Sequence, residues 1–97
     1  MAAKPPVTLQ ADWESTLQPW LLRVAEQLDV ACVDLDVDRV HTMTGVVADG
    51  VQRSMAPISA FLVGAAVARG ASLEEACAAV EVVTRSPAGT EILDTVQ

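Results

Sequence analysis

The feature that most constrains this chain is an apolar stretch at residues 57–70, P-I-S-A-F-L-V-G-A-A-V-A-R-G. Its length and composition predict a helix, in which successive side chains are turned by about 100° around the axis. Between Pro57 and Arg69 the only polar side chain is that of Ser59. Because a helix without a polar side has to be buried on most sides, we expect other helices of the chain, or a partner chain, to pack around it.

The two faces of this predicted helix differ in the size of their side chains. The large-residue face carries Ile58, Phe61, Leu62 and Ala65. The small-residue face carries Ala60, Val63, Gly64 and Val67. The spacing of Ala60 and Gly64 allows another helix to approach closely. We expect the large-residue face to meet the first and second helices of the chain, and the small-residue face to be closed by the fourth helix or by another chain.

Three further helices are predicted over residues 15–28, 37–54 and 73–85. Each has apolar residues spaced by three and four, which places them along one side of a helix. Residues 29–38 alternate apolar and acidic side chains, and we expect an extended loop there because a lone strand has no pairing partner. Four helices with short connections predict an all-α fold, a small four-helix bundle with the apolar third helix at its centre.

Capping residues indicate where two of these helices begin. Ser15 with Gln18, and Ser72 with Glu75, each have the spacing of a capping box, in which the first side chain accepts a hydrogen bond from a backbone N–H of the first turn. In the first helix, Pro19 then falls in the first turn, where its missing N–H costs nothing.

Three glycines also have a structural interpretation. Gly70 is expected to end the third helix. Gly45 and Gly50 each weaken the second helix by about 1 kcal/mol relative to alanine. We therefore expect a neighbouring backbone to come close to the helix at both positions.

The length of 97 residues corresponds to one domain. We expect residues 1–11 to be a flexible arm, residues 12–86 to form a single four-helix domain, and residues 87–97 to be a tail. The tail either adds one docked turn through Ile92 and Leu93 or frays.

Composition excludes several classes of partner. The formal net charge is −7, and the six basic residues are spread along the chain, so neither nucleic acid nor an anionic membrane is an expected partner. The first residues have no apolar signal segment, and the longest apolar run is too short to span a bilayer. Two cysteines do not make a secreted disulfide scaffold. We expect a cytoplasmic protein with reduced thiols.

Three aspartates, Asp34, Asp36 and Asp38, have the spacing of the start of a calcium loop. The rest of that motif is absent, because its sixth position is Arg39 and its twelfth is Gly45. Two or three carboxylates can also hold Mg²⁺ beside a phosphate, but no phosphate-binding loop lies nearby. Helix capping and solvation explain these residues more simply, and no metal is expected.

The sequence has no convincing catalytic group. His41 is the only histidine, and it does not make a zinc site with Cys32 and Cys77, whose spacing fits no ligand pattern. Cys77 falls on the inner face of its predicted helix, where a thiol is usually inert. Cys32 lies in a loop within possible reach of His41, but nothing in the sequence shows that it is activated. We expect neither catalysis nor a cofactor.

Part of the chain resembles a known kind of domain. Residues 46–64 read V-V-A-D-G-V-Q-R-S-M-A-P-I-S-A-F-L-V-G, preceded by L-Q-P-W-L-L-R-V-A-E-Q-L-D-V and the Asp-rich loop. Residues 15–85 resemble a small helical domain of actinobacteria, which occurs alone or fused behind proteins similar to the molybdenum-cofactor guanylyltransferase. The most specific positions are Gly50, Arg53, Ala56, Pro57, Phe61, Leu62 and Gly64.

The resemblance implies an association with the synthesis of molybdopterin-guanine dinucleotide. It implies no chemistry by these residues, because the domain has no established activity. The Gly-rich nucleotide-binding opening of the guanylyltransferase is absent from this sequence, so none of that enzyme's active-site residues is carried over.

These observations predict a non-enzymatic accessory module that acts by contact. The expected partner is a second copy of the chain or a cofactor-biosynthesis enzyme, because the chain has more apolar helix surface than its own helices need. The expected contact residues are Ala60, Val63, Gly64 and Val67 on the small-residue face, together with Trp13 and Trp20.

The alternative is a domain that binds a nucleotide or phosphate. Arg53 lies just before the third helix, where it would meet an anion at the helix N-terminus, and Asp49 would orient its guanidinium. The simpler interpretation is that Asp49 and Arg53, four residues apart, form an ion pair on the surface of the second helix.

Overall fold

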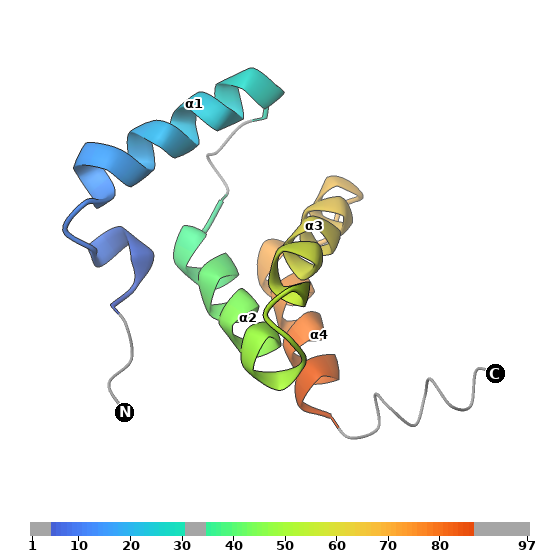
Figure 1. Cartoon of the computed structure of the whole chain (residues 1–97). Coiled ribbons are helices and arrows are strands. Elements are labelled where there is room, and N and C mark those ends of the chain that lie inside the picture. The colour runs from blue at the N-terminus through green and yellow to red at the C-terminus, as the bar shows by residue number, and fades with distance from the viewer. Residues whose placement is uncertain (1–4, 31–34, 87–97) are drawn as a thin grey trace. The chain divides into compact units, whose positions relative to one another are not determined.

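The computed structural model of the chain describes residues 5–30 and 35–86. This part is helical, without strands, and the predicted all-α class with four helices is confirmed (Figure 1). Two short helical segments, η1 (Val7–Leu9) and η2 (Trp13–Leu17), precede the α-helices. The α-helices are α1 (Gln18–Leu28), α2 (Val37–Gly50), α3 (Met55–Ala68) and α4 (Leu73–Arg85). The predictions for Cys32, Asp34 and residues 87–97 lie outside the described residues.

The contacts within the chain divide it into two compact units, whereas the sequence predicts one domain over residues 12–86. The first unit is Met1–Asp38 and the second is Arg39–Gln97. The first contains η1, η2 and α1, while the second contains α3, α4 and nearly all of α2.

In the first unit, the helix begins earlier than its predicted cap. The N–H groups of Thr16 and Leu17 both donate to the carbonyl oxygen of Asp12, which forms the π-helical turn η2. Ser15 therefore lies inside the helical segment, and the predicted cap at Ser15 is wrong. Pro19 lies in the first turn of α1, as predicted. No residue that the structure describes in this unit is buried.

Part of the predicted flexible arm is hydrogen-bonded. Thr8, in η1, donates its backbone N–H to Oδ1 of Asp38 over 3.1 Å and its hydroxyl to Oδ2 over 2.5 Å. Asp38 therefore has a defined partner, and its carboxylate holds η1.

In the second unit, α2, α3 and α4 pack around a small apolar core (Figure 1). The buried residues of this core come from all three helices: Met43, Val47, Val63, Ala76 and Cys77. A second group of partly buried side chains packs against them: Val40, Ala60, Ala66, Leu73 and Val80. Nearly all these side chains are small or medium-sized, and α3 and α4 lie close together.

The close approach predicted at two glycines of α2 occurs at one of them. A Cβ atom added to Gly50 would lie 2.6 Å from Cγ2 of Thr84 in α4 and 3.7 Å from the backbone carbonyl oxygen of the same residue. A neighbouring helix is therefore close at Gly50, but the nearest atom belongs to a side chain and not to the predicted backbone. At Gly45 there is nothing within 4 Å, so the prediction is wrong at that position. α2 also ends at Gly50, because the N–H groups of Val51 and Gln52 both turn back to the carbonyl oxygen of Val47.

The turn between α3 and α4 follows its sequence signals. Gly70 has a φ of 111°, a backbone conformation that favours glycine, and the N–H of Ala71 donates to the carbonyl oxygen of Ala66. Ser72 then caps α4, since its hydroxyl accepts the N–H of Glu75 over 3.0 Å. Both predictions are confirmed.

The environment of α3 differs from the prediction for residues 57–70. The helix begins at Met55, with Pro57 in its first turn, and Val63 is its only described buried residue. All four members of the large-residue face are exposed, including Phe61 at 74% and Leu62 at 60%. The other helices of the chain therefore do not cover α3 on most sides, and the prediction that its large-residue face meets the first and second helices is wrong. Cover by a partner chain stays a prediction.

The small-residue face of α3 is divided between the core and the solvent. Val63 is 3% exposed and Ala60 packs against the core, while Gly64 and Val67 are exposed. Small side chains turn inward because they let α3 and the alanine-rich α4 approach closely. Of the two expected partners for this face, the fourth helix takes the buried part.

Candidate functional site

An apolar groove of about 370 Å³ lies between the helices of the second unit. Its walls are chiefly aliphatic side chains from α3, from α4 and from the end of α2. They include Val51, Met55, Ile58, Leu62, Val80 and Val83. None of the residues lining this groove is charged, so it offers a ligand or partner contact with hydrocarbon.

Two hydroxyl groups line the groove, and both are already hydrogen-bonded. The Ser59 hydroxyl lies 2.7 Å from the carbonyl oxygen of Ala56, to which it donates, and 3.5 Å from Sδ of Met43. The Thr84 hydroxyl donates to the carbonyl oxygen of Val80 over 2.7 Å. A polar ligand would therefore find few groups to orient it here.

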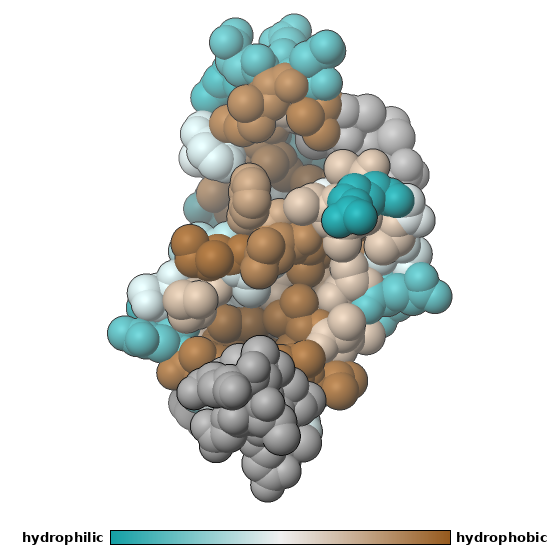
Figure 2. All heavy atoms as spheres, turned by 90° about the vertical axis from the view of Figure 1, so that its right-hand side faces the viewer, coloured by the Kyte–Doolittle hydropathy of each residue, from teal (hydrophilic) through white to brown (hydrophobic). Residues whose placement is uncertain are grey.

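The rim of the groove continues into an exposed apolar surface. Phe61 lies on α3 next to Leu62, which lines the groove. We define the apolar surface as the groove together with its six exposed large side chains: Val51, Met55, Ile58, Phe61, Leu62 and Val83. These side chains are between 42% and 74% exposed. Figure 2 shows hydrophobic atoms gathered over much of the side of the molecule on which α3 and α4 lie.

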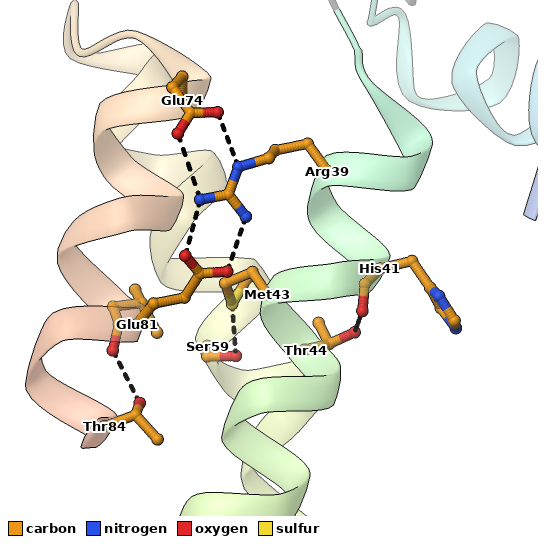
Figure 3. A network of polar contacts seen from close by, with 9 residues as sticks. Arg39, His41, Met43, Thr44, Ser59, Glu74, Glu81 and Thr84 are labelled. Atoms are coloured by element: carbon orange, nitrogen blue, oxygen red, sulfur yellow. Dashed lines mark hydrogen bonds and ion pairs between the residues drawn. The ribbon is translucent and has the colours of Figure 1, made fainter. Parts of the chain in front are cut away.

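The polar centre of the second unit is a cluster of one arginine and two glutamates (Figure 3). Arg39 of α2 donates from Nε to Glu74 over 2.7 Å, and from Nη1 and Nη2 to Glu81 over 2.7 and 2.8 Å. A further contact of 3.3 Å joins Nη2 to Glu74. The guanidinium therefore bridges two carboxylates that stand seven residues apart on α4.

The charges in this cluster stabilise one another. Hydrogen bonds from Arg39 hold the pKa of the Glu81 carboxyl below its ordinary value, and the carboxylates raise the pKa of Arg39. The side chains of Arg39 and Glu81 are 18% and 12% exposed. This geometry is that of a structural clamp between α2 and α4, because all three guanidinium nitrogens donate to the two carboxylates.

Sequence reasoning did not predict this clamp. The available signal was the spacing of seven residues between Glu74 and Glu81, which puts both on one side of α4. Their partner is 35 and 42 residues away in the sequence, so only the packing of α2 on α4 identifies it.

The predicted pair of Asp49 and Arg53 is not formed. Both side chains are exposed, and the structure, which describes both residues, has no ion pair between them. The reason is that α2 ends at Gly50, so Arg53 lies in the following turn and not one helical turn after Asp49.

The N-terminus of α3 is a poor anion site. The N–H groups of Met55 and Ala56 donate to the carbonyl oxygens of Gln52 and Arg53, and Pro57 has no N–H. The first three positions of the helix therefore present no backbone donor to a phosphate, which counts against the ligand-binding alternative.

The residues predicted for interaction are found in different environments. Val63 is buried in the core and is not available to a partner, so that prediction is wrong, and Ala60 is partly covered. Gly64 and Val67 are exposed, as is Trp20 at 56% in a shallow hollow of α1 with Val24 and Leu28. Trp13 is half-buried. The structure does not bring the two tryptophans together with α3 in one unit.

No catalytic or metal-binding cluster forms in the part of the chain that the structure describes. His41 is exposed, and its imidazole points away from Arg39 (Figure 3), while Cys77 is completely buried. Residues 5–30 and 35–86 contain no group of three or more potential metal ligands. Among these residues there is also no helix long and apolar enough to cross a membrane.

Comparison with known proteins identifies one family. Residues 12–92 match the model of a domain of unknown function, DUF6457. The match includes all four α-helices and both sides of the groove. No curated protein and no solved structure matches the chain.

Proposed function

We propose that this chain, which belongs to the DUF6457 family, is a non-enzymatic module that binds another protein through the apolar surface of its second unit. The observation that carries the proposal is the exposure of Phe61, at 74%, beside an uncharged groove. Aromatic side chains next to a pocket are typical anchors of protein interfaces.

The size of the apolar surface supports this function. Its six large side chains expose roughly 600 Å² per chain, taking about 150–200 Å² for each when fully exposed. A continuous apolar patch of roughly 300–600 Å² is the largest that a typical monomer exposes, and such a patch is often functional. Leaving this area in water would be unfavourable, so a binding partner gains from covering it.

The polar groups of the second unit support contact over chemistry. Arg39 is held by two carboxylates, and the hydroxyls that line the groove are bonded to the backbone. In an enzyme, the side chains that act as acid, base or nucleophile have to be directed at a substrate. The guanidinium and the hydroxyl groups named above are instead bonded to the protein itself.

For the partner, we propose a second copy of the chain or a cytoplasmic enzyme of molybdopterin-guanine dinucleotide synthesis. The support for the enzyme is the resemblance of residues 15–85 to a domain fused behind guanylyltransferase-like proteins. A fused domain and a separate one can serve the same contact, because fusion only raises the local concentration of the two partners.

The test is binding of the purified chain to the guanylyltransferase of the same organism, measured by calorimetry. The change Phe61→Asp is expected to weaken binding by about 30-fold or more, as for other aromatic anchors. The matched control is Val82→Asp, because Val82 is 66% exposed on α4 but does not line the groove. Equal affinity of the two variants would contradict the proposal.

Calorimetry also distinguishes the ligand-binding alternative from the proposed protein-binding function. If Arg53 holds a nucleotide or phosphate, GTP and inorganic phosphate should give heat of binding that is lost in Arg53→Ala. The interaction function predicts no heat with either compound.

A further inference from the structure

The apolar surface carries both a projecting side chain and a groove. Phe61 projects from α3 at its edge, and the groove of about 370 Å³ lies beside it. An enclosed apolar cavity of about 150 Å³ is enough to bind benzene, so the groove has room for a phenyl ring. One face of the chain thus carries both a projecting ring and a hollow that can accept one.

A symmetric dimer needs a projection and a matching hollow on the same face of each copy. In a symmetric dimer the same surface patch is used by both copies, so every projection must meet a hollow of the same patch. An axis that passes between Phe61 and the groove places the ring of each copy over the groove of the other.

Charge also favours a second copy over a strongly charged partner. The described residues of the second unit, 39–86, contain four arginines and four carboxylate side chains, so this part has no net charge although the chain carries −7. No charged residue lines the groove. Two such surfaces meet without repulsion, whereas a basic or acidic partner finds no opposite charge to pair with.

The area is sufficient for a dimer of modest stability. Roughly 600 Å² from each copy gives about 1,200 Å² in total, which is the lower limit for stable protein interfaces. The groove walls and Phe61 would form its apolar centre.

We infer that the apolar surface joins two copies of this chain about a two-fold axis, with Phe61 of each copy inserted into the groove of the other. This inference rests on the proposed function, because it names the partner that meets the same surface. It adds a defined stoichiometry, a symmetry and a central residue.

The experiment is the molar mass of the full chain, measured by light scattering behind a sizing column over a series of concentrations. The unmodified chain is expected to show twice its monomer mass and to dissociate on dilution. Phe61→Asp should raise the dissociation constant by about 30-fold or more, whereas Val82→Asp should leave it unchanged.

A second variant tests the groove independently of the ring. Ala79 lines the groove and is exposed, so Ala79→Leu fills part of the hollow without removing Phe61. This change is expected to weaken the dimer as well, while circular dichroism shows an unchanged helix content.

Three results would overturn the inference, and they differ in what they leave standing. A chain that is monomeric at every concentration, yet binds the guanylyltransferase in a Phe61-dependent way, overturns the dimer and keeps the proposed function. A dimer that Phe61→Asp does not weaken uses another surface. A monomer that Phe61→Asp strongly destabilises covers this surface within its own chain, which overturns both proposals.

Discussion

The two sides of α3 are both apolar, yet they have opposite environments. Val63 on the inner side is 3% exposed, and Phe61 on the outer side is 74% exposed. The inner side has the smaller residues and lies against α4, whose own buried residues are Ala76 and Cys77. The difference shows that side-chain size, and not hydrophobicity, decides which side of such a helix joins the core, because only small residues permit a close helix contact.

The largest effect is expected from putting the same charge on each side of α3. Val63→Asp would bury a carboxylate among apolar side chains, and we expect it to lower the free energy of unfolding by about 4 kcal/mol or more. Phe61→Asp should change the stability of the monomer by only about 0.5 kcal/mol, because the side chain is in water. Urea unfolding of the two variants at low protein concentration measures both values. Similar losses would remove the distinction between the sides.

A second comparison uses two glycines, one in a close contact and one in the open. Gly50→Ala places a methyl group 2.6 Å from Cγ2 of Thr84, and we expect a loss of about 1–3 kcal/mol from overpacking. Gly64→Ala on α3 meets nothing within 4 Å and should stabilise the chain by about 0.5–1 kcal/mol, since alanine is the better helix former. Thermal unfolding should therefore shift in opposite directions. A gain at Gly50 would show that α2 and α4 are less closely packed there.

A third test concerns the polar contact between α2 and α4. Glu81→Gln removes one carboxylate from Arg39 and should cost about 1–2 kcal/mol at neutral pH, because the contact is a charged hydrogen bond at a partly covered site. Glu75→Gln is the matched control, since Glu75 is exposed on the same helix and has no side-chain bond in the described structure. Glu81→Gln should therefore have the lower urea midpoint of the two variants. If it is as stable as the control, the contact between Arg39 and Glu81 does not contribute to stability.

The smallest effect is the pH dependence of the same clamp. The pKa of Glu81 is lower in the folded chain than its ordinary value of 4.5. Its contribution is therefore complete above that value and is lost as the pH falls through the lower, folded value. Between neutral pH and about pH 3 the unmodified chain should lose more stability than Glu81→Gln. Parallel losses would show that the carboxylate is not stabilised by Arg39.

Local features of the fold were predictable because they depend on neighbouring residues. Ser72 and Gly70 act through their own side chain or backbone within one turn, so the start of α4 and the end of α3 followed from the sequence. Ser15 failed as a cap because the competing carbonyl of Asp12 begins the helix earlier. Asp49 and Arg53 failed as a pair because the end of α2 fell between them.

The sequence predicted the apolar residues of the candidate site, but not where the groove forms. The apolar character of residues 57–70 is a property of the sequence, and it correctly indicated a surplus of hydrophobic surface. The fourth helix covers part of its small-residue face, as predicted, but its large-residue face was predicted to meet the first two helices and is exposed. Periodicity describes which residues share a face but not which neighbour that face meets. The groove itself combines Val51, Leu62 and Val83 from three parts of the chain, and no local pattern connects them.

The sequence by itself determined the helices, most of their ends and the excess of apolar surface, since hydrogen bonding and side-chain spacing within a few residues decide these properties. Tertiary structure alone decided that Arg39 clamps Glu74 and Glu81, that Gly50 and not Gly45 lies against α4, and that Phe61 faces outward. These outcomes depend on the distance between helices, and that distance is set by how small residues from separate segments pack against each other.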